Sequence, residues 1–168
     1  MLLTGTYDRS LDDKQRLALP KRFRDLLAPE GEPLLLTPGT DGSLALYAES
    51  AFARVAEKLA GQSPTALDVR AFSRLLYAQS QSVDLDSQGR LRIPPELGSL
   101  AGLGREVVLL GVGDHVELWD KARWAEYLSQ EQPRYDQLAE RAFGDLAPPI
   151  SENPKAEADK NPRPLNPR

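Results

Sequence analysis

The chain has 168 residues, a formal net charge of −4, 40% hydrophobic residues, no cysteine and a single histidine, His115. The apolar content is enough for a modest core, while the lack of cysteine and of a second histidine argues against disulfides, thiolate catalysis and most zinc sites. No stretch approaches the roughly 20 apolar residues of a membrane helix, and the first residues are unlike a signal peptide. We therefore expect a cytoplasmic protein with no membrane association, no cofactor and no metal.

Basic residues gather near the amino-terminal end although the whole chain is acidic. Residues 1–24 hold six basic and three acidic residues, a local net charge of +3. Affinity for DNA depends heavily on Lys and Arg meeting phosphates, so this end is the candidate nucleic-acid-binding region. The acidic remainder of the chain would discourage indiscriminate binding to nucleic acid.

In the first half of the chain, strands and helices alternate. Pro20 ends a short strand and suits the first turn of a helix. Val69, Phe72 and Leu76 form an apolar stripe at helical spacing. The elements that we expect here are a helix over 21–27, strands over 34–37 and 44–47, and helices over 49–60 and 65–78.

The second half begins with two short strands in which apolar and polar residues alternate. They flank the turn-forming run Asp86–Gly89, and Pro94 follows the second strand. Pro133 interrupts a later helix. The expected elements are strands over 83–85 and 91–93, a helix over 95–100, strands over 106–110 and 116–119 joined by a turn at 111–114, and helices over 121–130 and 135–143. Residues 145–168 are polar and proline-rich, so we expect a disordered tail.

The chain contains an internal repeat. Segment 11–20 reappears at an offset of 74 residues as segment 85–94, with Leu, Asp, Arg, Leu and Pro in the same places. Such self-similarity indicates two copies of one structural unit. Farther along, two pairs of aromatic residues match, which we assign to core packing rather than base stacking: Tyr47 with Trp119, and Phe52 with Trp124. We expect a first repeat over 1–53, linking helices over 54–80, and a second repeat with its carboxy-terminal helix over 81–144.

The pattern Leu-Asp-x-x-x-Arg-Leu-x-Leu/Ile-Pro, present twice and followed each time by a strand pair ending in Tyr or Trp, resembles the MraZ family over residues 1–145. This resemblance implies an α+β fold in which two tandem AbrB/SpoVT-like repeats form a pseudo-symmetric double-hairpin β-barrel with peripheral helices. It also implies a sequence-specific DNA-binding transcriptional regulator. Family members form homo-oligomeric rings on double-stranded DNA, bind tandem promoter repeats of the cell-division and cell-wall operon, and usually repress it. We expect nucleoid association accordingly.

For the first hairpin, we assign Arg16 to base or backbone contact with DNA, because a firmly held guanidinium suits bidentate contact to guanine. Asp12 would hold the hairpin through an ion pair with Arg16. Gln15 stands where the second copy has Gly89, so we expect a different turn at the first tip. Further cations are assigned to phosphate contacts, with an ordinary solvated face as the alternative: Lys14, Lys21, Arg22 and Arg24.

The second copy is less basic, with a net charge of −1 over residues 83–97. Asp86 and Arg90 are therefore expected to orient their hairpin without a principal DNA role. The run Gly111–Gly113 invites comparison with a phosphate loop, but no Gly-Lys-Ser/Thr follows, and we interpret it as a turn. We expect His115 to be a half-buried filler at the start of a strand.

We do not expect an enzyme or a small-molecule substrate. Neighbouring acidic residues on a strand point to opposite faces, which does not suit paired acid–base chemistry. The alternative function is an oligomeric protein-interaction module of the same fold that does not bind DNA. An antitoxin-like AbrB relative is disfavoured, because such chains generally carry a single hairpin and a toxin-binding tail.

Overall fold

The computed structural model describes residues 2–29 and 31–144. The tail that we expect over 145–168 lies outside the described residues. The chain divides into two compact units, Met1–Leu128 and Ser129–Arg168. The candidate site lies within the first unit.

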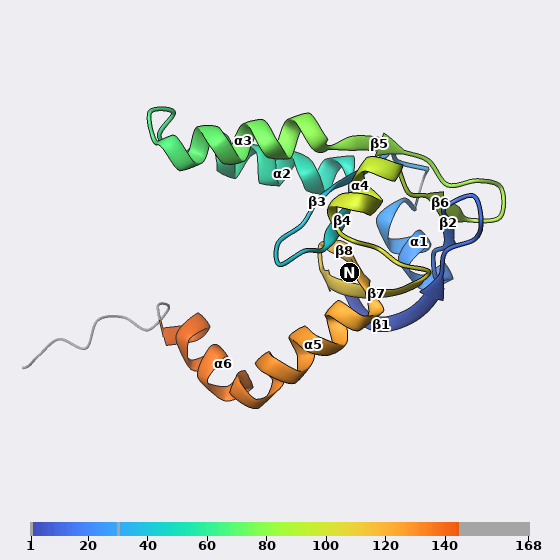
Figure 1. The fold of residues 1–168 in the computed structure, drawn as a ribbon. Coiled ribbons are helices and arrows are strands. Elements are labelled where there is room, and N and C mark those ends of the chain that lie inside the picture. Colours follow the sequence, from blue (N-terminus) through green and yellow to red (C-terminus); the bar gives the residue numbers. More distant parts are fainter. Residues whose placement is uncertain (1, 30, 145–168) are drawn as a thin grey trace, which may run out of the picture. The chain divides into compact units, whose positions relative to one another are not determined.

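The first unit is built on a six-stranded antiparallel sheet (Figure 1). Its strands, in spatial order, are β1 (Leu3–Ser10), β7 (Glu106–Gly113), β8 (His115–Asp120), β4 (Leu44–Ala48), β3 (Leu34–Pro38) and β5 (Gln81–Val83). The sheet is open, with β1 and β5 as its outer strands, and the described strands do not close into the expected barrel. A separate two-stranded ribbon pairs β2 (Arg16–Ala18) with β6 (Arg90–Arg92).

The strand order follows the sequence repeat. Counting inward from either edge gives matching strands: β1 with β5, β7 with β3, and β8 with β4. At the centre, β4 pairs with β8 through Leu46 opposite Val116. The pairs β1–β7, β3–β5, β4–β8 and β2–β6 each join one repeat to the other, so the two repeats form one sheet together.

The helices of this unit agree closely with the sequence-based expectations. Three bounds are confirmed: α1 (Lys21–Leu27), α4 (Pro95–Leu100) and α2 (Glu49–Ala60). Helix α3 (Leu67–Gln79) starts two residues later than expected, and α5 (Lys121–Glu131) starts where predicted. Helices α2 and α3 form a pair at one side of the sheet, where Phe52 contacts Tyr77 edge to face (Figure 1).

The main core lies between the six-stranded sheet, the ribbon and the two short helices. Its fully buried members include Leu17, Leu91, Phe23, Leu97, Leu36, Leu46, Leu109 and Leu118. A smaller cluster packs Trp119 against Trp124 and Tyr127. Of the four aromatic residues assigned to packing, Phe52 and Trp119 are buried and Tyr47 and Trp124 are half-buried.

One sequence-based expectation about the strands of this unit is wrong. Residues 111–113 are not a turn, because β7 continues to Gly113 and pairs with β1, a strand that the sequence did not predict. Gly111 suits this pairing, since a Cβ there would lie 2.5 Å from the backbone nitrogen of Thr4. The apolar stripe lies on helix α3, as the sequence predicted, and it is buried at Leu76 while Phe72 is 51% exposed.

The second unit contains the end of α5, a 3₁₀ turn (Gln132–Arg134) and α6 (Tyr135–Gly144). Pro133 lies in the 3₁₀ turn, which confirms that the helix is interrupted there and then resumes. Tyr135 and Phe143 of α6 are largely exposed. In the described ranges, we find no helix with both the length and the apolar character needed to cross a bilayer.

Candidate nucleic-acid interface

The ribbon brings the two copies of the repeated segment together. Arg16 lies opposite Arg92, Leu17 opposite Leu91, and Ala18 opposite Arg90. Side chains alternate between the faces of a strand, so the two leucines point into the core, where both are buried. The outer face therefore carries three arginines and one alanine.

Each hairpin turn has the same backbone arrangement. Asp12 N donates to Arg16 O at 2.8 Å and Gln15 N donates to Asp12 O at 2.9 Å; Asp86 N donates to Arg90 O at 3.0 Å and Gly89 N to Asp86 O at 2.8 Å. Gln15 has φ +58°, close to the +71° of Gly89. The expectation of a different turn at the first tip is therefore wrong, because Gln15 adopts the left-handed conformation that glycine reaches more easily.

Four side chains form a ring of ion pairs across the two hairpins, which we call the Asp–Arg tetrad: Asp12, Arg16, Asp86 and Arg90. Arg16 Nη2 lies 2.8 Å from Asp12 Oδ2, and Arg90 Nη2 lies 2.8 Å from Asp86 Oδ2. The cross pairs are longer, with Arg16 Nη1 at 3.7 Å from Asp86 Oδ2 and Arg90 Nη1 at 3.9 Å from Asp12 Oδ2. The tetrad thus links the two repeats as well as each hairpin within itself.

The aspartates hold the arginines through one edge of each guanidinium. Arg16 Nε donates to Asp12 Oδ2 at 2.9 Å, and Arg90 Nε donates to Asp86 Oδ2 at 2.8 Å. The Nε–Nη2 edge is therefore occupied, while Nη1 has only the longer contacts. Because the arginine side chains are 26% and 28% exposed, their remaining donors can meet an acceptor outside the protein.

The charges in the tetrad stabilise the ionised carboxylates. The side-chain hydrogen bond from Arg16 lowers the pKa of Asp12 to about 2, helped by backbone hydrogen bonds from Arg16 and Lys14. The backbone hydrogen bond from Arg90, followed by its side chain, lowers the pKa of Asp86. Both aspartates are therefore charged at neutral pH and keep the guanidiniums in place.

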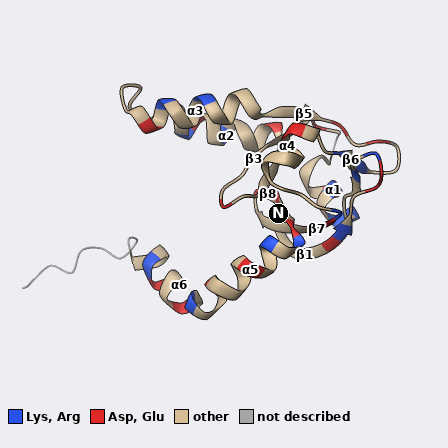
Figure 2. Cartoon of the chain, viewed as in Figure 1, with Lys and Arg blue, Asp and Glu red and all other residues tan. Residues whose placement is uncertain are grey.

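The other cations assigned from the sequence are spread over a wider area. Lys14 is exposed at the first tip, next to the tetrad. In α1, Lys21 pairs with Asp25 at 3.3 Å, and Arg22 Nη2 donates to Thr4 Oγ1 at 3.2 Å. Lys and Arg residues, drawn in blue in Figure 2, lie in β1, in the hairpins and in α1.

Arg24 is half-buried beside the second hairpin. Its guanidinium contacts Gly89, and no hydrogen-bond partner of its buried Nε is found among the described residues. A hollow of about 570 Å³ separates α1 from residues 83–89 and is lined by Lys21, Arg24, Asp25, Asp84 and Asp86, among others. Helix α1 of the first repeat therefore lies beside the hairpin of the second.

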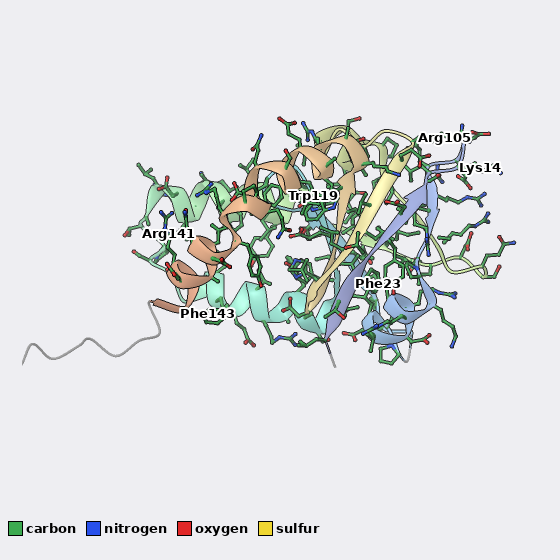
Figure 3. The ribbon with its side chains drawn as sticks, turned by 90° about the horizontal axis from the view of Figure 1, so that it is seen from below. Lys14, Phe23, Arg105, Trp119, Arg141 and Phe143 are labelled. Atoms are coloured by element: carbon green, nitrogen blue, oxygen red, sulfur yellow. The ribbon has the colours of Figure 1, made fainter. Side chains whose placement is uncertain are left out.

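Sequence reasoning missed three arginines near the ribbon. Arg9 Nε donates to Ala18 O at 3.1 Å, Arg92 lies opposite Arg16, and Arg105 O accepts from Leu11 N at 2.8 Å. Figure 3 shows Lys14 and Arg105 at the same edge of the first unit. The net charge of each repeat by itself does not reveal the position of Arg92, because Arg92 of the second repeat pairs with the strand of the first.

His115 begins β8 and is half-buried, as the sequence predicted. Its Nδ1 lies 2.9 Å from Asp114 Oδ1 and its Nε2 lies 3.7 Å from Glu117 Oε1. Burial by itself would lower the pKa of His115, but the two carboxylates outweigh it and raise the pKa. No group of three or more His, Cys, Asp or Glu side chains suited to a metal ion is found within 2–29 and 31–144.

The family comparison decides the identity of the repeat. The family model described as "MraZ protein, putative antitoxin-like" matches the chain twice in succession, over residues 2–75 and 76–146. The chain belongs to the MraZ family. This confirms both the resemblance found in the sequence and the presence of two repeats, within a mixed α and β fold that contains an antiparallel sheet.

Curated relatives named "Transcriptional regulator MraZ" cover most of the chain. The relative from Thermomicrobium roseum is 40% identical over 79% of this chain and 93% of its own length. The relative from Finegoldia magna is 38% identical over 83% and 95%, and that from Corynebacterium kroppenstedtii is 40% identical over 84% and 97%. These proteins are named as regulators of transcription and not as enzymes.

Proposed function

We propose that the chain is a sequence-specific DNA-binding transcriptional regulator that meets double-stranded DNA with the outer face of the β2–β6 ribbon. The names of the relatives support regulation of transcription. The single observation that carries the DNA interface is the Asp–Arg tetrad, which presents Arg16 and Arg90 together on one face.

The tetrad suits base recognition for a physical reason. A long arginine side chain loses conformational freedom when it binds, but these two are already held by carboxylates. A guanidinium with free terminal donors can bond guanine O6 and N7 in the major groove, and a two-stranded ribbon fits that groove. The exposed donors of Arg16 and Arg90 support the proposal that both residues contact bases.

The roles that we propose follow from these positions. Arg16 contacts bases, as expected from the sequence, and Arg90 shares this role because its partners and exposure match those of Arg16. Asp12 and Asp86 orient the two arginines. Lys14, Lys21 and Arg22 contact phosphates. Arg24 is better placed to support the second hairpin, since its guanidinium contacts Gly89.

We further propose that the protein works as a homo-oligomeric ring of swapped-hairpin, barrel-like protomers, as the family resemblance implies. Exposed apolar residues on α3 support an assembly, since exposed patches of this kind mark interaction sites: Leu67, Phe72, Leu75 and Tyr77. Several protomers on tandem promoter repeats would raise the overall affinity by avidity. The proposed outcome is repression of the cell-division and cell-wall operon by a cytoplasmic, nucleoid-associated protein.

Fluorescence anisotropy tests this function with a labelled duplex from upstream of the chain's own gene. The unsubstituted chain should bind, and Arg16→Ala and Arg90→Ala should each weaken binding by about tenfold or more, since a bidentate pair contributes roughly 1 to 3 kcal/mol. Arg141→Ala, at an exposed position on α6, is the matched control and should bind normally.

Each failure has a distinct meaning. If Arg16→Ala weakens binding and Arg90→Ala does not, the base-contacting role belongs to the first repeat alone. If the unsubstituted chain ignores the duplex even at low salt, where phosphate contacts are strongest, the DNA-binding function is wrong. A protein-interaction module of the same fold would then be the better description.

A further inference from the structure

The ribbon has an approximate two-fold symmetry that follows from the repeat. Adding 74 to a residue number in the first hairpin gives its counterpart in the second, and the pair Arg16–Arg92 maps onto the pair Arg90–Ala18. The flanking bonds obey the same relation: Ile93 N donates to Gln15 O at 2.8 Å, and Leu19 N donates to Gly89 O at 3.1 Å. The backbone alone would therefore fit a duplex in two opposite directions.

The side chains at the two ends of the ribbon break this symmetry. The end at the first tip carries Lys14 and, through the pairing with Arg16, Arg92. The matching positions at the other end are Gln88 and Ala18. Because the two strands are antiparallel, the extra cation of the second repeat adds to the charge at the tip of the first.

The cations at the first tip are available for binding. Lys14, Arg92 and Arg105 are exposed. Within the described part of the chain, these three side chains make no hydrogen bond or ion pair. Arg105 lies beside the first hairpin, because its carbonyl accepts from Leu11 N and it lines a hollow with Asp12 and Gln15.

Cations near the other tip are engaged within the protein. In α1, which lies beside that tip, Lys21 pairs with Asp25 at 3.3 Å and Arg22 Nη2 donates to Thr4 Oγ1 at 3.2 Å. Arg9 donates through Nε to Ala18 O and through Nη1 to Asp8 O at 2.7 Å, and it lies over the Tyr7 ring. Arg24 is half-buried against Gly89. These guanidiniums are therefore less free to follow a phosphate than those at the first tip.

We propose that Arg92, with Lys14 and Arg105, grips the DNA backbone at one end of the ribbon and so fixes the direction in which each protomer lies on the duplex. This inference rests on the proposed DNA-binding function and adds a polarity to it. The base-contacting arginines are nearly symmetric and do not by themselves distinguish the two directions. The direction with more phosphate contacts is favoured by the affinity that those contacts contribute.

Directed cleavage of DNA tests the polarity without knowledge of the operator. The chain has no cysteine, so a single introduced cysteine can carry an iron–EDTA group at a chosen site. Asp13→Cys and Ser87→Cys label the two tips at counterpart, exposed positions. Each labelled protein is bound to the upstream duplex, and the cleavage positions are mapped on both strands.

In the unsubstituted background, the two labels should cleave at separate positions, each on its own side of every bound segment. The exchange variant Lys14→Gln, Ala18→Arg, Gln88→Lys and Arg92→Ala keeps the net charge while it reverses the asymmetry. In that background, the two cleavage patterns should trade places or merge. Circular dichroism of the variant checks that the fold is intact.

The salt dependence of binding is a second, independent measurement. For each bound protomer, Arg92→Ala should reduce the slope of log K against log salt by about 0.9 on duplex DNA. Ala18→Arg should increase the slope by a similar amount, and the control Arg141→Ala should leave it unchanged. This readout needs no cysteine label.

Two results would overturn the inference while leaving the proposed function intact. One is cleavage at the same positions by both labels in the unsubstituted background, and the other is an unchanged pattern in the exchange variant. An Arg92→Ala slope equal to that of the unsubstituted chain would remove Arg92 from the phosphate contacts. Failure of the unsubstituted chain to bind the duplex would end the proposed function together with the inference.

Discussion

The two hairpin turns have nearly the same backbone but different surroundings. Gln15 and Gly89 occupy matching positions with similar positive φ, yet Gln15 is exposed and Gly89 is buried. The cause is the helix beside each turn. Arg24 of α1 covers Gly89, whereas its counterpart in α4 is Gly98, which has no side chain with which to cover Gln15.

This difference shows that a residue in one repeat sets the constraints on the other. Glycine at position 89 satisfies both a positive φ and the close approach of a guanidinium, while position 15 has only the first requirement and accepts glutamine at some cost in backbone strain. The turn residues of one copy therefore have to be interpreted together with the helix of the other.

The largest difference that we expect between the repeats concerns the short helices. Phe23 of α1 and Leu97 of α4 are buried counterparts, and Phe23 also contacts Tyr7 edge to face with ring centroids 4.9 Å apart. Phe23→Ala should lower the free energy of unfolding by about 3 to 5 kcal/mol, and Leu97→Ala by about 2 to 5 kcal/mol. Urea unfolding measures both. A smaller loss at Phe23 than at Leu97 would contradict this ranking.

The hairpin turns should respond differently to a change at their left-handed residue. Gly89→Ala introduces both backbone strain and a contact with Arg24 and should cost about 1 to 3 kcal/mol of stability. Gln15→Gly should change stability by less than about 1 kcal/mol, because residue 15 already adopts a positive φ and its turn is exposed. Adding Arg24→Ala to Gly89→Ala should restore part of the loss. Absence of any rescue would show that strain alone limits position 89.

Acid should affect the first hairpin more than the second. A carboxyl whose pKa is lowered by folding stabilises the protein above its unfolded pKa, about 3.8, and this contribution is lost as the pH falls through the folded value, about 2 for Asp12. The difference in unfolding midpoint between the unsubstituted chain and Asp12→Asn should therefore shrink from pH 5 to pH 2. Asp86→Asn should show the same trend to a smaller extent. Parallel curves over this range would contradict the role of the tetrad.

The smallest effect concerns a position at which the second repeat has a titratable side chain and the first does not. His115 matches Ser43 of the first repeat, whose hydroxyl donates to Thr40 O. A raised pKa means that His115 stabilises the fold fully below about pH 6.5 and that this contribution is lost as the pH rises through the folded pKa. The melting temperature of His115→Gln, measured from pH 5 to 9, should approach that of the unsubstituted chain at high pH. A constant difference would assign packing alone to His115.

Much of the local structure was predictable because its signals are local. Pro20 and Pro94 mark the starts of α1 and α4, and the repeated Asp-x-x-x-Arg spacing correctly indicated an ion pair in each hairpin. The pairing between repeats was not readable from charges summed along the chain. Two features depend on this pairing and were therefore not predicted: the strand at residues 111–113, which pairs with β1, and the position of Arg92 beside the first tip.

The alternation of strands from the two halves of the chain has a mechanical consequence. Among the strands of the described residues, β3–β4 and β7–β8 are pairs within a single repeat, while four other pairs join the halves. A protease that cleaved the connection between α2 and α3 would leave two fragments that remain associated through those four strand pairs. Separating the fragments would require unfolding of the sheet itself. The covalent link between the halves therefore ensures that both are made in equal amounts more than it holds the folded halves together.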